Sequence, residues 1–168
     1  PAEAVGLDGI EKVIREESLI RAVENGQDKV ARWNMMMAST EGAMAFSKGL
    51  GAVHSMSHAI GADQNLRLHH GTLNAVILPT VLRFNKEHVG DKYSKIARAM
   101  GKEDSADLAE IIEDLNIKIG LPRGLKEMGV TEKMIPELID HSIADPSNAT
   151  TPRLPNRKEW EELFLDSM

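Results

Sequence analysis

The sequence predicts an all-α fold, a multi-helix bundle of about seven or eight helices in a single domain over residues 1–168. Apolar residues recur at helical spacing along most of the chain, and the alternating β-branched runs expected of strands are nearly absent. Aromatic residues make up only 4% of the chain while nine residues are methionine, a composition that suits packed helices more than a sheet.

The first two predicted helices occupy the segment before the histidines. Residues 7–25 follow a helical period, which Asn25-Gly26 ends as a C-terminal cap would. Asp28 is a suitable N-cap for a second helix that continues to about Phe46. Within it, we interpret the methionines at 35–37 as core filling rather than as cofactor contacts.

A pair of helices with a loop between them is predicted next. The first ends at Gly61, and the second, residues 72–84, is apolar nearly all round and is therefore expected to be buried. Pro79 within the second helix should kink or split it, because proline lacks an N–H and clashes with the preceding turn.

The remaining helices are predicted from their caps and stops. A short helix covers residues 91–100, and Asp104 or Ser105 is expected to cap the next one. Thr131 is expected to cap another helix. In it His141 lies at helical spacing from Glu137 and Asp145, which we interpret as surface charge pairing rather than a second metal site. A last helix follows a capping box at 156–159 and buries Trp160, Leu163 and Phe164.

Four of the six histidines fall between residues 49 and 85. His54 and His58 are four apart, so a helix places both on one face, and His69-His70 opens the helix after the loop. Neutral imidazole is a common ligand of borderline divalent metals and also titrates near neutral pH. The spacing alone leaves two interpretations open, a metal or proton-transfer site and ordinary helix histidines.

The histidines belong to a longer spaced series, which consists of Gly51, His54, His58, Gly61, His70-Gly71, Pro79 and Asn85. This series resembles the second signature of the iron-dependent (group III) alcohol dehydrogenases. The resemblance covers essentially the whole chain, more loosely toward the C-terminus. It corresponds only to the helical half of that family, the dehydroquinate-synthase-like C-terminal domain.

The resemblance implies a role for each candidate residue. His54 and His70 look like two metal ligands, His58 resembles the proton-relay histidine, and Phe46 corresponds to a region near the cofactor and substrate cleft. His69 competes with His70, because the loop before them looks about two residues longer than in much of the family. The expected metal is Fe²⁺, with Zn²⁺ as the alternative.

Part of the family's machinery is missing from this chain. The other two metal ligands come from an Asp-x-x-x-His helix, and no such motif occurs here. The N-terminal α/β domain that binds most of the NAD(P) is also absent, and the chain opens at Pro1 as if cut from a longer protein. We therefore expect the parent to interconvert an alcohol and an aldehyde or ketone, and the chain alone to be inactive.

Two other functions remain as alternatives. One is a stand-alone helical interaction module without catalysis. The other is a metal hydrolase that uses His54, His58 and His70 as three ligands around a metal-bound water. Geometry separates them, because only the hydrolase requires all three imidazoles to converge on one ion.

The resemblance implies a small alcohol or aldehyde as the substrate, and composition argues against other kinds of partner. The net charge of −6 and the lack of a basic face argue against nucleic acid. No apolar run approaches the roughly 20 residues of a membrane span, and no signal peptide is evident, so we expect a cytoplasmic protein. The absence of cysteine excludes disulfides and thiolate ligands. Assembly into a homo-oligomer stays open.

Overall fold

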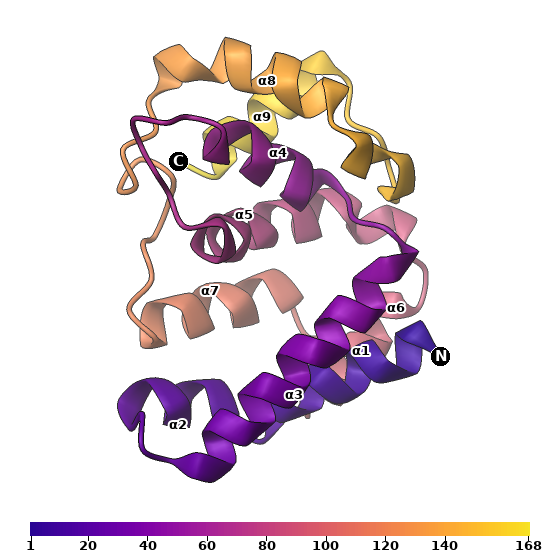
Figure 1. Ribbon diagram of the computed structural model, residues 1–168. Coiled ribbons are helices and arrows are strands. Elements are labelled where there is room, and N and C mark those ends of the chain that lie inside the picture. Colours follow the sequence, from indigo (N-terminus) through magenta and orange to yellow (C-terminus); the bar gives the residue numbers. More distant parts are fainter. The chain divides into compact units, whose positions relative to one another are not determined.

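The structure, a computed structural model, describes residues 1–168 and contains nine α-helices and no strand, which confirms the predicted all-α class (Figure 1). The helices are α1 (Ala2–Ile10), α2 (Ser18–Glu24), α3 (Lys29–Ala45), α4 (Ala52–Gly61), α5 (His70–Asn85), α6 (Lys92–Ala99), α7 (Leu108–Lys118), α8 (Ile135–Ala144) and α9 (Arg157–Asp166). Each of them falls short of the length and apolar character that a bilayer-spanning helix requires.

The chain divides into two compact units. Unit 1 consists of residues 1–48 and 90–107 and holds α1, α2, α3 and α6. Unit 2 consists of residues 49–89 and 108–168 and holds the other five helices, including both histidine-bearing ones. His54, His58 and His70 therefore all belong to unit 2.

In unit 1 the first predicted helix is divided in two, which accounts for the additional helix. A π-helical stretch, Glu11–Arg15, follows α1, and Glu17 then adopts a left-handed backbone with φ of 53°. A left-handed residue interrupts the helical hydrogen-bond ladder, so α2 starts anew at Ser18. No glycine marks this break, and the sequence pattern therefore missed it.

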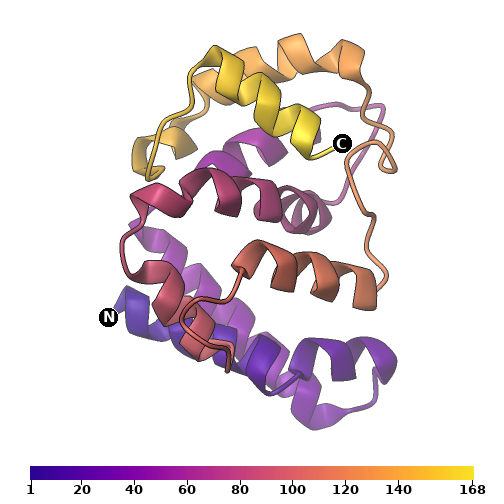
Figure 2. The same ribbon diagram turned by 180° about the vertical axis from the view of Figure 1, so that it is seen from behind.

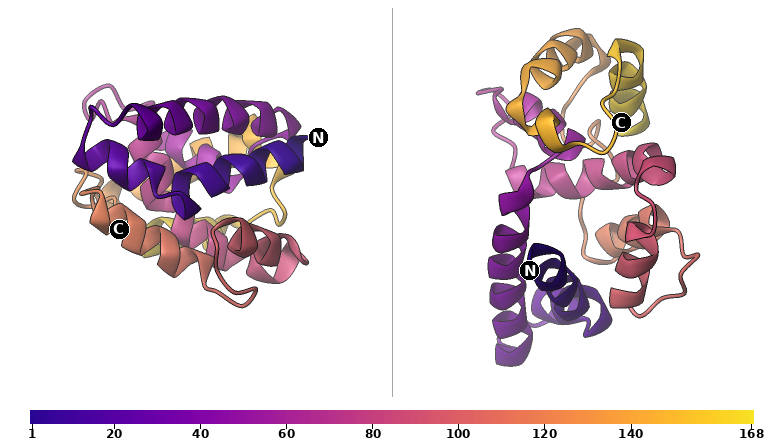
Figure 3. Two further views of the ribbon diagram at one scale, coloured as in Figure 1. Left: turned by 90° about the horizontal axis from the view of Figure 1, so that it is seen from below. Right: turned by 90° about the vertical axis from the view of Figure 1, so that its right-hand side faces the viewer.

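The helices α1 and α3 of unit 1 run side by side (Figure 3, left). They approach closely because α1 presents glycines: a Cβ atom added at Gly6 would lie 3.3 Å from the Cβ of Ala45. The buried residues of α3 are accordingly small or paired, namely Ala31, Ala38 and Glu41. The interpretation of the methionines at 35–37 as core filling was wrong, since Met36 is 64% exposed and the other two are only partly buried.

In unit 2 the core lies between α4, α5, α8 and α9, and α9 packs against both α8 and α5 (Figure 2). The largest fully buried side chains are Trp160, Phe164, Met56, Ile60, Leu73, Ile77 and Leu125. The predicted capping box of α9 is confirmed, because Asn156 accepts from the N–H of Glu159 and the Glu159 carboxylate accepts from the N–H of Asn156. This core fixes the positions of α4 and α5, which carry the histidines.

Pro79 lies inside α5, which nevertheless continues from His70 to Asn85 and changes direction along its length (Figure 1). Proline leaves the carbonyl of the residue four positions earlier without its helical donor. That carbonyl belongs to Ala75, and it accepts from Nδ2 of Asn116 on α7 at 2.7 Å. A side chain from another helix thus replaces the missing backbone donor, and the helix is not split.

Two predicted caps differ from the structure, whereas the cap at Asp28 is confirmed by its bonds to the N–H groups of Val30 and Ala31. Thr131 precedes a 3₁₀ turn before α8, but its side chain makes no capping hydrogen bond. Asp104 and Ser105 do not cap α7, because that helix begins only at Leu108; the Asp104 carboxylate pairs with Arg98 at 2.5 Å instead.

Candidate metal and proton-transfer site

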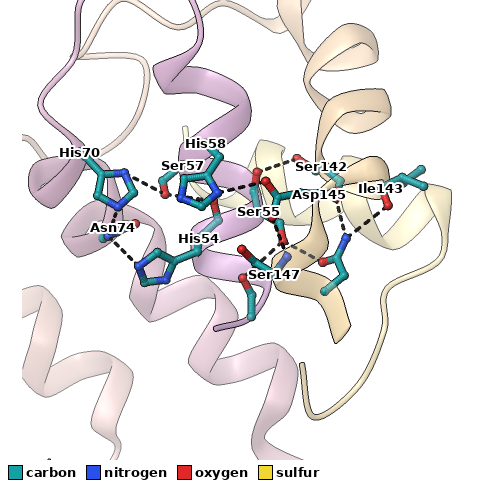
Figure 4. Close-up of polar contacts among 12 residues, drawn as sticks. His54, Ser55, Ser57, His58, His70, Asn74, Ser142, Ile143, Asp145 and Ser147 are labelled. Carbon is teal, nitrogen blue, oxygen red and sulfur yellow. Dashed lines mark hydrogen bonds and ion pairs between the residues drawn. The ribbon is translucent and has the colours of Figure 1, made fainter. Parts of the chain in front are cut away.

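Three imidazoles gather where α4 meets α5 (Figure 4). His54 and His58 lie one turn apart on α4, and His70 is the first residue of α5. The ring centroids are 5.7 Å apart for His54 and His58, 5.4 Å for His54 and His70, and 5.3 Å for His58 and His70. The fold thus brings together three of the four residues named as site candidates from the sequence.

His69 serves α5 as its N-cap. Its Nδ1 accepts from the backbone N–H of Thr72 at 3.3 Å and lies 3.2 Å from Oγ1 of the same residue. A nitrogen engaged in capping has its lone pair directed at the helix end. Of the two neighbouring histidines, His70 is therefore the one that the fold brings to His54 and His58.

Asn74, one turn after His70 on α5, connects two of the rings. Its Nδ2 lies 3.0 Å from Nε2 of His70 and 3.4 Å from Nε2 of His54. An amide nitrogen can only donate, so both Nε2 atoms must accept and carry lone pairs. The lone pairs of two imidazoles on different helices are thus directed at the same amide, whose Oδ1 is buried without a hydrogen-bond partner.

The tautomer of His70 agrees with this arrangement. Its Nδ1 lies 3.5 Å from Oγ of Ser57, which is fully buried and donates its own hydroxyl proton to the carbonyl of His54 at 3.1 Å. The Ser57 oxygen is then free to accept a proton from Nδ1 of His70. A partner at one ring nitrogen decides which nitrogen carries the proton, and here it leaves Nε2 unprotonated.

Asp145 contacts His58, which the sequence did not predict. Its Oδ2 lies 3.0 Å from Nδ1 of His58, while Oδ1 accepts from the N–H of Ser147 at 2.8 Å. The predicted partnership of Asp145 with His141 was wrong, because Asp145 ends α8 in an extended backbone that turns its carboxylate to α4. The two residues are 87 positions apart, so no local spacing could have revealed the contact.

Burial and mutual repulsion favour the neutral forms of His54 and His70. The pKa of His54 is lowered by burial first and then by the neighbouring His70 and His58, and the pKa of His70 is lowered by burial and by His58 and His69. Burial acts to raise the pKa of the Asp145 carboxyl, but hydrogen bonds from Ser147 and His58 outweigh it and lower that pKa. The neutral forms of His54 and His70 are the ones whose nitrogen lone pairs can bind a metal.

The donor set fits half of a divalent metal site. Two neutral imidazoles with convergent Nε2 lone pairs supply two nitrogen ligands of the kind that borderline metals bind. No group of three His, Asp or Glu side chains in the chain is arranged to hold a metal ion. The hydrolase alternative, which requires three converging imidazoles, therefore receives no support from the geometry.

Phe46, the fourth candidate, belongs to unit 1. It is the first residue of the 3₁₀ turn Phe46–Lys48 that follows α3, and its side chain is 55% exposed. An aromatic side chain exposed to this degree is available for contact with a ligand.

The fold and the site define a helical domain with a cluster of three histidines, His54, His58 and His70. Residues 3–168 match the family described as "Fe-containing alcohol dehydrogenase family, C-terminal", and the chain belongs to this family. It is 43% identical over 175 residues to 4-hydroxybutyrate dehydrogenase of Cupriavidus necator, covering 100% of this chain and 45% of the relative. It is 36% identical to lactaldehyde reductase of Escherichia coli K12, covering 82% of this chain and 38% of the relative.

Solved structures agree with the family assignment. A crystal structure of 1,3-propanediol oxidoreductase superposes with a TM-score of 0.91 and 31% identity, covering 99% of this chain and 45% of that one. The alcohol dehydrogenase from Oenococcus oeni gives a TM-score of 0.92 and 25% identity, covering 100% of this chain and 45% of that one. The chain thus spans less than half the length of the relatives it matches.

Proposed function

We propose that this chain is the metal-site domain of an NAD(P)-dependent dehydrogenase that interconverts a small alcohol and an aldehyde or ketone. The observation that carries the proposal is the convergence of Nε2 of His54 and Nε2 of His70 beside the ring of His58. Membership of the Fe-containing alcohol dehydrogenase family supplies the reaction class.

His54 and His70 would hold the metal, Fe²⁺ or alternatively Zn²⁺, through their Nε2 atoms. When bound, such an ion supplies Lewis acidity that polarises the alcohol oxygen and favours departure of hydride. Asn74 keeps the two imidazoles directed at one point before binding, since its amide is within 3.4 Å of both nitrogens. Ser57 and Asn74 together fix the tautomer of His70.

His58 would take the proton that the alcohol releases. Its ring stacks on His70 with an interplanar angle of 16°, so it lies beside the proposed metal position, and its Nδ1 is already engaged with Asp145. Nε2 is the nitrogen left for proton transfer. Phe46 would form part of the wall of the cofactor cleft, with NAD(P) bound mainly by an α/β domain such as the rest of the family carries.

The substrate is proposed from the relatives. The relative with 43% identity is named for oxidation of 4-hydroxybutyrate, and others are named for 1,3-propanediol and lactaldehyde. These names share a short chain with a second oxygen function besides the reacting group. We therefore take 4-hydroxybutyrate as the first substrate to test, with 1,3-propanediol as the second.

By itself the chain should show no dehydrogenase activity, because it offers two metal ligands and contains no nucleotide-binding α/β unit. The purified chain is mixed with Fe²⁺ or Zn²⁺, NAD⁺ or NADP⁺ and 4-hydroxybutyrate, and reduced cofactor is followed by absorbance. Reduction above that of a His54→Ala, His70→Ala double variant would contradict this part of the proposal.

A chimera tests the activity itself. In the Cupriavidus necator 4-hydroxybutyrate dehydrogenase, the segment that this chain matches is exchanged for residues 1–168. We expect metal-dependent oxidation of 4-hydroxybutyrate, lost on His54→Ala or His70→Ala and strongly reduced on His58→Gln. His88→Gln and His141→Gln, outside the cluster, are matched controls that should leave the rate unchanged. A folded, metal-loaded chimera without activity would favour the non-catalytic interaction module instead.

A further inference from the structure

We propose that Asp145 is the positioning residue of His58: it accepts the Nδ1 proton, holds the ring in one tautomer and leaves Nε2 as the only nitrogen able to take a proton from substrate. The positioning stands on the geometry of unit 2, and only its use in catalysis rests on the proposed function.

The contact itself has an ordinary hydrogen-bond distance. Oδ2 of Asp145 lies 3.0 Å from Nδ1 of His58, and the side chains are 14% and 41% exposed, respectively. A carboxylate accepts hydrogen bonds and cannot donate when ionised, so the ring nitrogen facing it must carry the proton. In this arrangement a largely buried carboxylate binds one nitrogen of the histidine ring and leaves the other nitrogen available for proton transfer.

Asp145 is itself held on two sides. Asp145 is the N-cap of the 3₁₀ turn Pro146–Thr150, where its Oδ1 accepts from the N–H of Ser147, so Oδ2 is the oxygen left for His58. The turn is bound to α4 through Asn148, whose Oδ1 accepts from Oγ of Ser55 at 2.8 Å. Ser55 lies three residues before His58 on the same helix, which ties the carboxylate to the helix that carries its partner (Figure 4).

A second set of bonds holds the turn to the end of α8. Nδ2 of Asn148 donates to the carbonyl of Ser142 at 2.6 Å, and Oγ of Ser142 donates to the carbonyl of Ser55 at 3.4 Å. Ser55 and Ser142 are both fully buried. Buried and satisfied networks of this kind are rigid, so the carboxylate keeps its place relative to the ring.

The ring of His58 stacks on the ring of His70, with 5.3 Å between the centroids. Two orientations of the His58 ring, related by a half-turn, keep this stacking. Only one of them presents Nδ1 to Asp145, and in that orientation Nε2 is directed away from the carboxylate. The carboxylate thus selects both the orientation and the tautomer.

In the proposed reaction the alcohol O–H bond would break and its proton would move to Nε2 of His58. NAD(P)⁺, held mainly by the α/β domain, would be the oxidant that takes the hydride from the alcohol carbon. Nδ1 keeps its proton throughout. The imidazolium formed is stabilised by the Asp145 carboxylate, which remains ionised.

The test uses the 168-residue chain labelled with ¹⁵N at histidine, without metal, at about pH 8, above the ordinary histidine pKa of about 6.5. Nitrogen shifts distinguish a protonated ring nitrogen from one with a lone pair, and a His58→Gln spectrum assigns the signals. Asp145→Asn keeps the size and the cap acceptor for Ser147 but turns an amide N–H₂ toward His58. Asp145→Ser keeps a capping oxygen but is too short to reach the ring.

We expect His58 in the unmodified chain to carry its proton on Nδ1. In Asp145→Asn the shifts of the two nitrogens should exchange, because the amide donates and Nδ1 must accept. In Asp145→Ser the Nε2–H form, which an unpartnered imidazole in water favours, should become the major one. The signals of His70 should stay unchanged in both variants and report that the fold of the cluster is intact.

An Nε2–H tautomer in the unmodified chain would overturn the proposal without any variant, as would unchanged His58 shifts in Asp145→Asn with the His70 signals intact. Neither result depends on activity. If the chimera is inactive while the tautomer exchanges, the proposed function fails and the positioning role stands. If the chimera is active and the tautomer does not exchange, the positioning role fails alone.

Discussion

Asn116 on α7 donates its side-chain amide to the carbonyl oxygen of Ala75 on α5, at 2.7 Å. The contact is found where Pro79 deprives that carbonyl of its backbone donor, and Asn116 is 9% exposed. A buried carbonyl without a donor is costly, so this side chain is what allows an uninterrupted helix to pass through a proline. The helix in question carries His70 and Asn74, and its continuity therefore bears directly on the site.

Replacing Asn116 by Ala should destabilise the chain by about 1–3 kcal/mol, the cost of an unsatisfied buried acceptor. In a Pro79→Ala background the restored N–H at position 79 can serve Ala75, so the same replacement should cost clearly less. Urea unfolding of the four proteins of this double-mutant cycle measures the coupling. Equal costs in both backgrounds would show that the proline and the asparagine are unrelated.

The stability of the chain should fall as the pH falls from about 7.5 to about 5, because the unfolded histidines protonate at their ordinary pKa of about 6.5 while the folded ones resist. The pKa values of His54 and His70 are lowered in the fold, by burial first and then by neighbouring histidines. Protons therefore bind preferentially to the unfolded state below pH 6.5.

Urea unfolding in the presence of a chelator, at several pH values, checks this expectation. The control is a His54→Gln, His70→Gln double variant, whose stability should depend less on pH over the same range. The lowered carboxyl pKa values of Asp28 and Asp145 affect stability only at lower pH, because the ordinary pKa of an Asp carboxyl is 3.8. A double variant with the same slope as the unmodified chain would assign the pH dependence elsewhere.

Asn74→Asp should tighten binding of Zn²⁺ or Co²⁺ to the chain. The change places a carboxylate oxygen beside the two Nε2 atoms that now face the amide, at 3.0 Å and 3.4 Å, and completes a three-donor group. Asn74→Ala removes the group that holds the imidazoles together and should weaken binding by about 10–100-fold, as loss of supporting contacts around a metal commonly does. Titration calorimetry and the visible spectrum of Co²⁺ measure both, and equal affinities would disprove the assigned role.

Gly49→Ala and Gly42→Ala should have opposite effects on stability. Gly49 has φ of 123°, and a Cβ there would collide with the side chain of Thr150. Gly49→Ala should therefore lower the free energy of unfolding by about 1–3 kcal/mol. Gly42 lies within α3 with open space around its Cβ position, so Ala should stabilise by roughly 0.5–1 kcal/mol. Thermal unfolding of the two variants compares them, and a stable Gly49→Ala protein would mean that the turn adapts.

The sequence predicted those helix ends that depend on residues only two or three positions apart. Asp28 and the Asn156–Glu159 pair cap their helices as expected, because a cap depends only on residues two or three positions away. The break at Glu17 was missed, since a non-glycine residue adopts the left-handed conformation there with no local marker. Exposure of Met36 was missed as well, because an apolar side chain does not reveal which face of a helix is covered.

The site was predictable in part for the same reason. His54 and His58 follow from the helical period, and His70 from a helix that returns after a short loop. The positions of Asn74 and Asp145 depend on how α4 meets α5 and the end of α8, which no spacing encodes. Asn74 and Asp145, which orient the imidazoles, could therefore not be predicted from the sequence, whereas the three histidines could.

Along the chain the two units alternate: residues 1–48 belong to unit 1, 49–89 to unit 2, 90–107 to unit 1 and 108–168 to unit 2. Neither unit is a continuous stretch, so the order of synthesis on the ribosome matters. Unit 1 has all of its residues once position 107 has emerged, whereas α4 and α5 must wait for Asp145 and for the core residues of α9. The histidine cluster is thus among the last parts to mature, and a chain stalled before α8 would bear its imidazoles without the carboxylate that orders them.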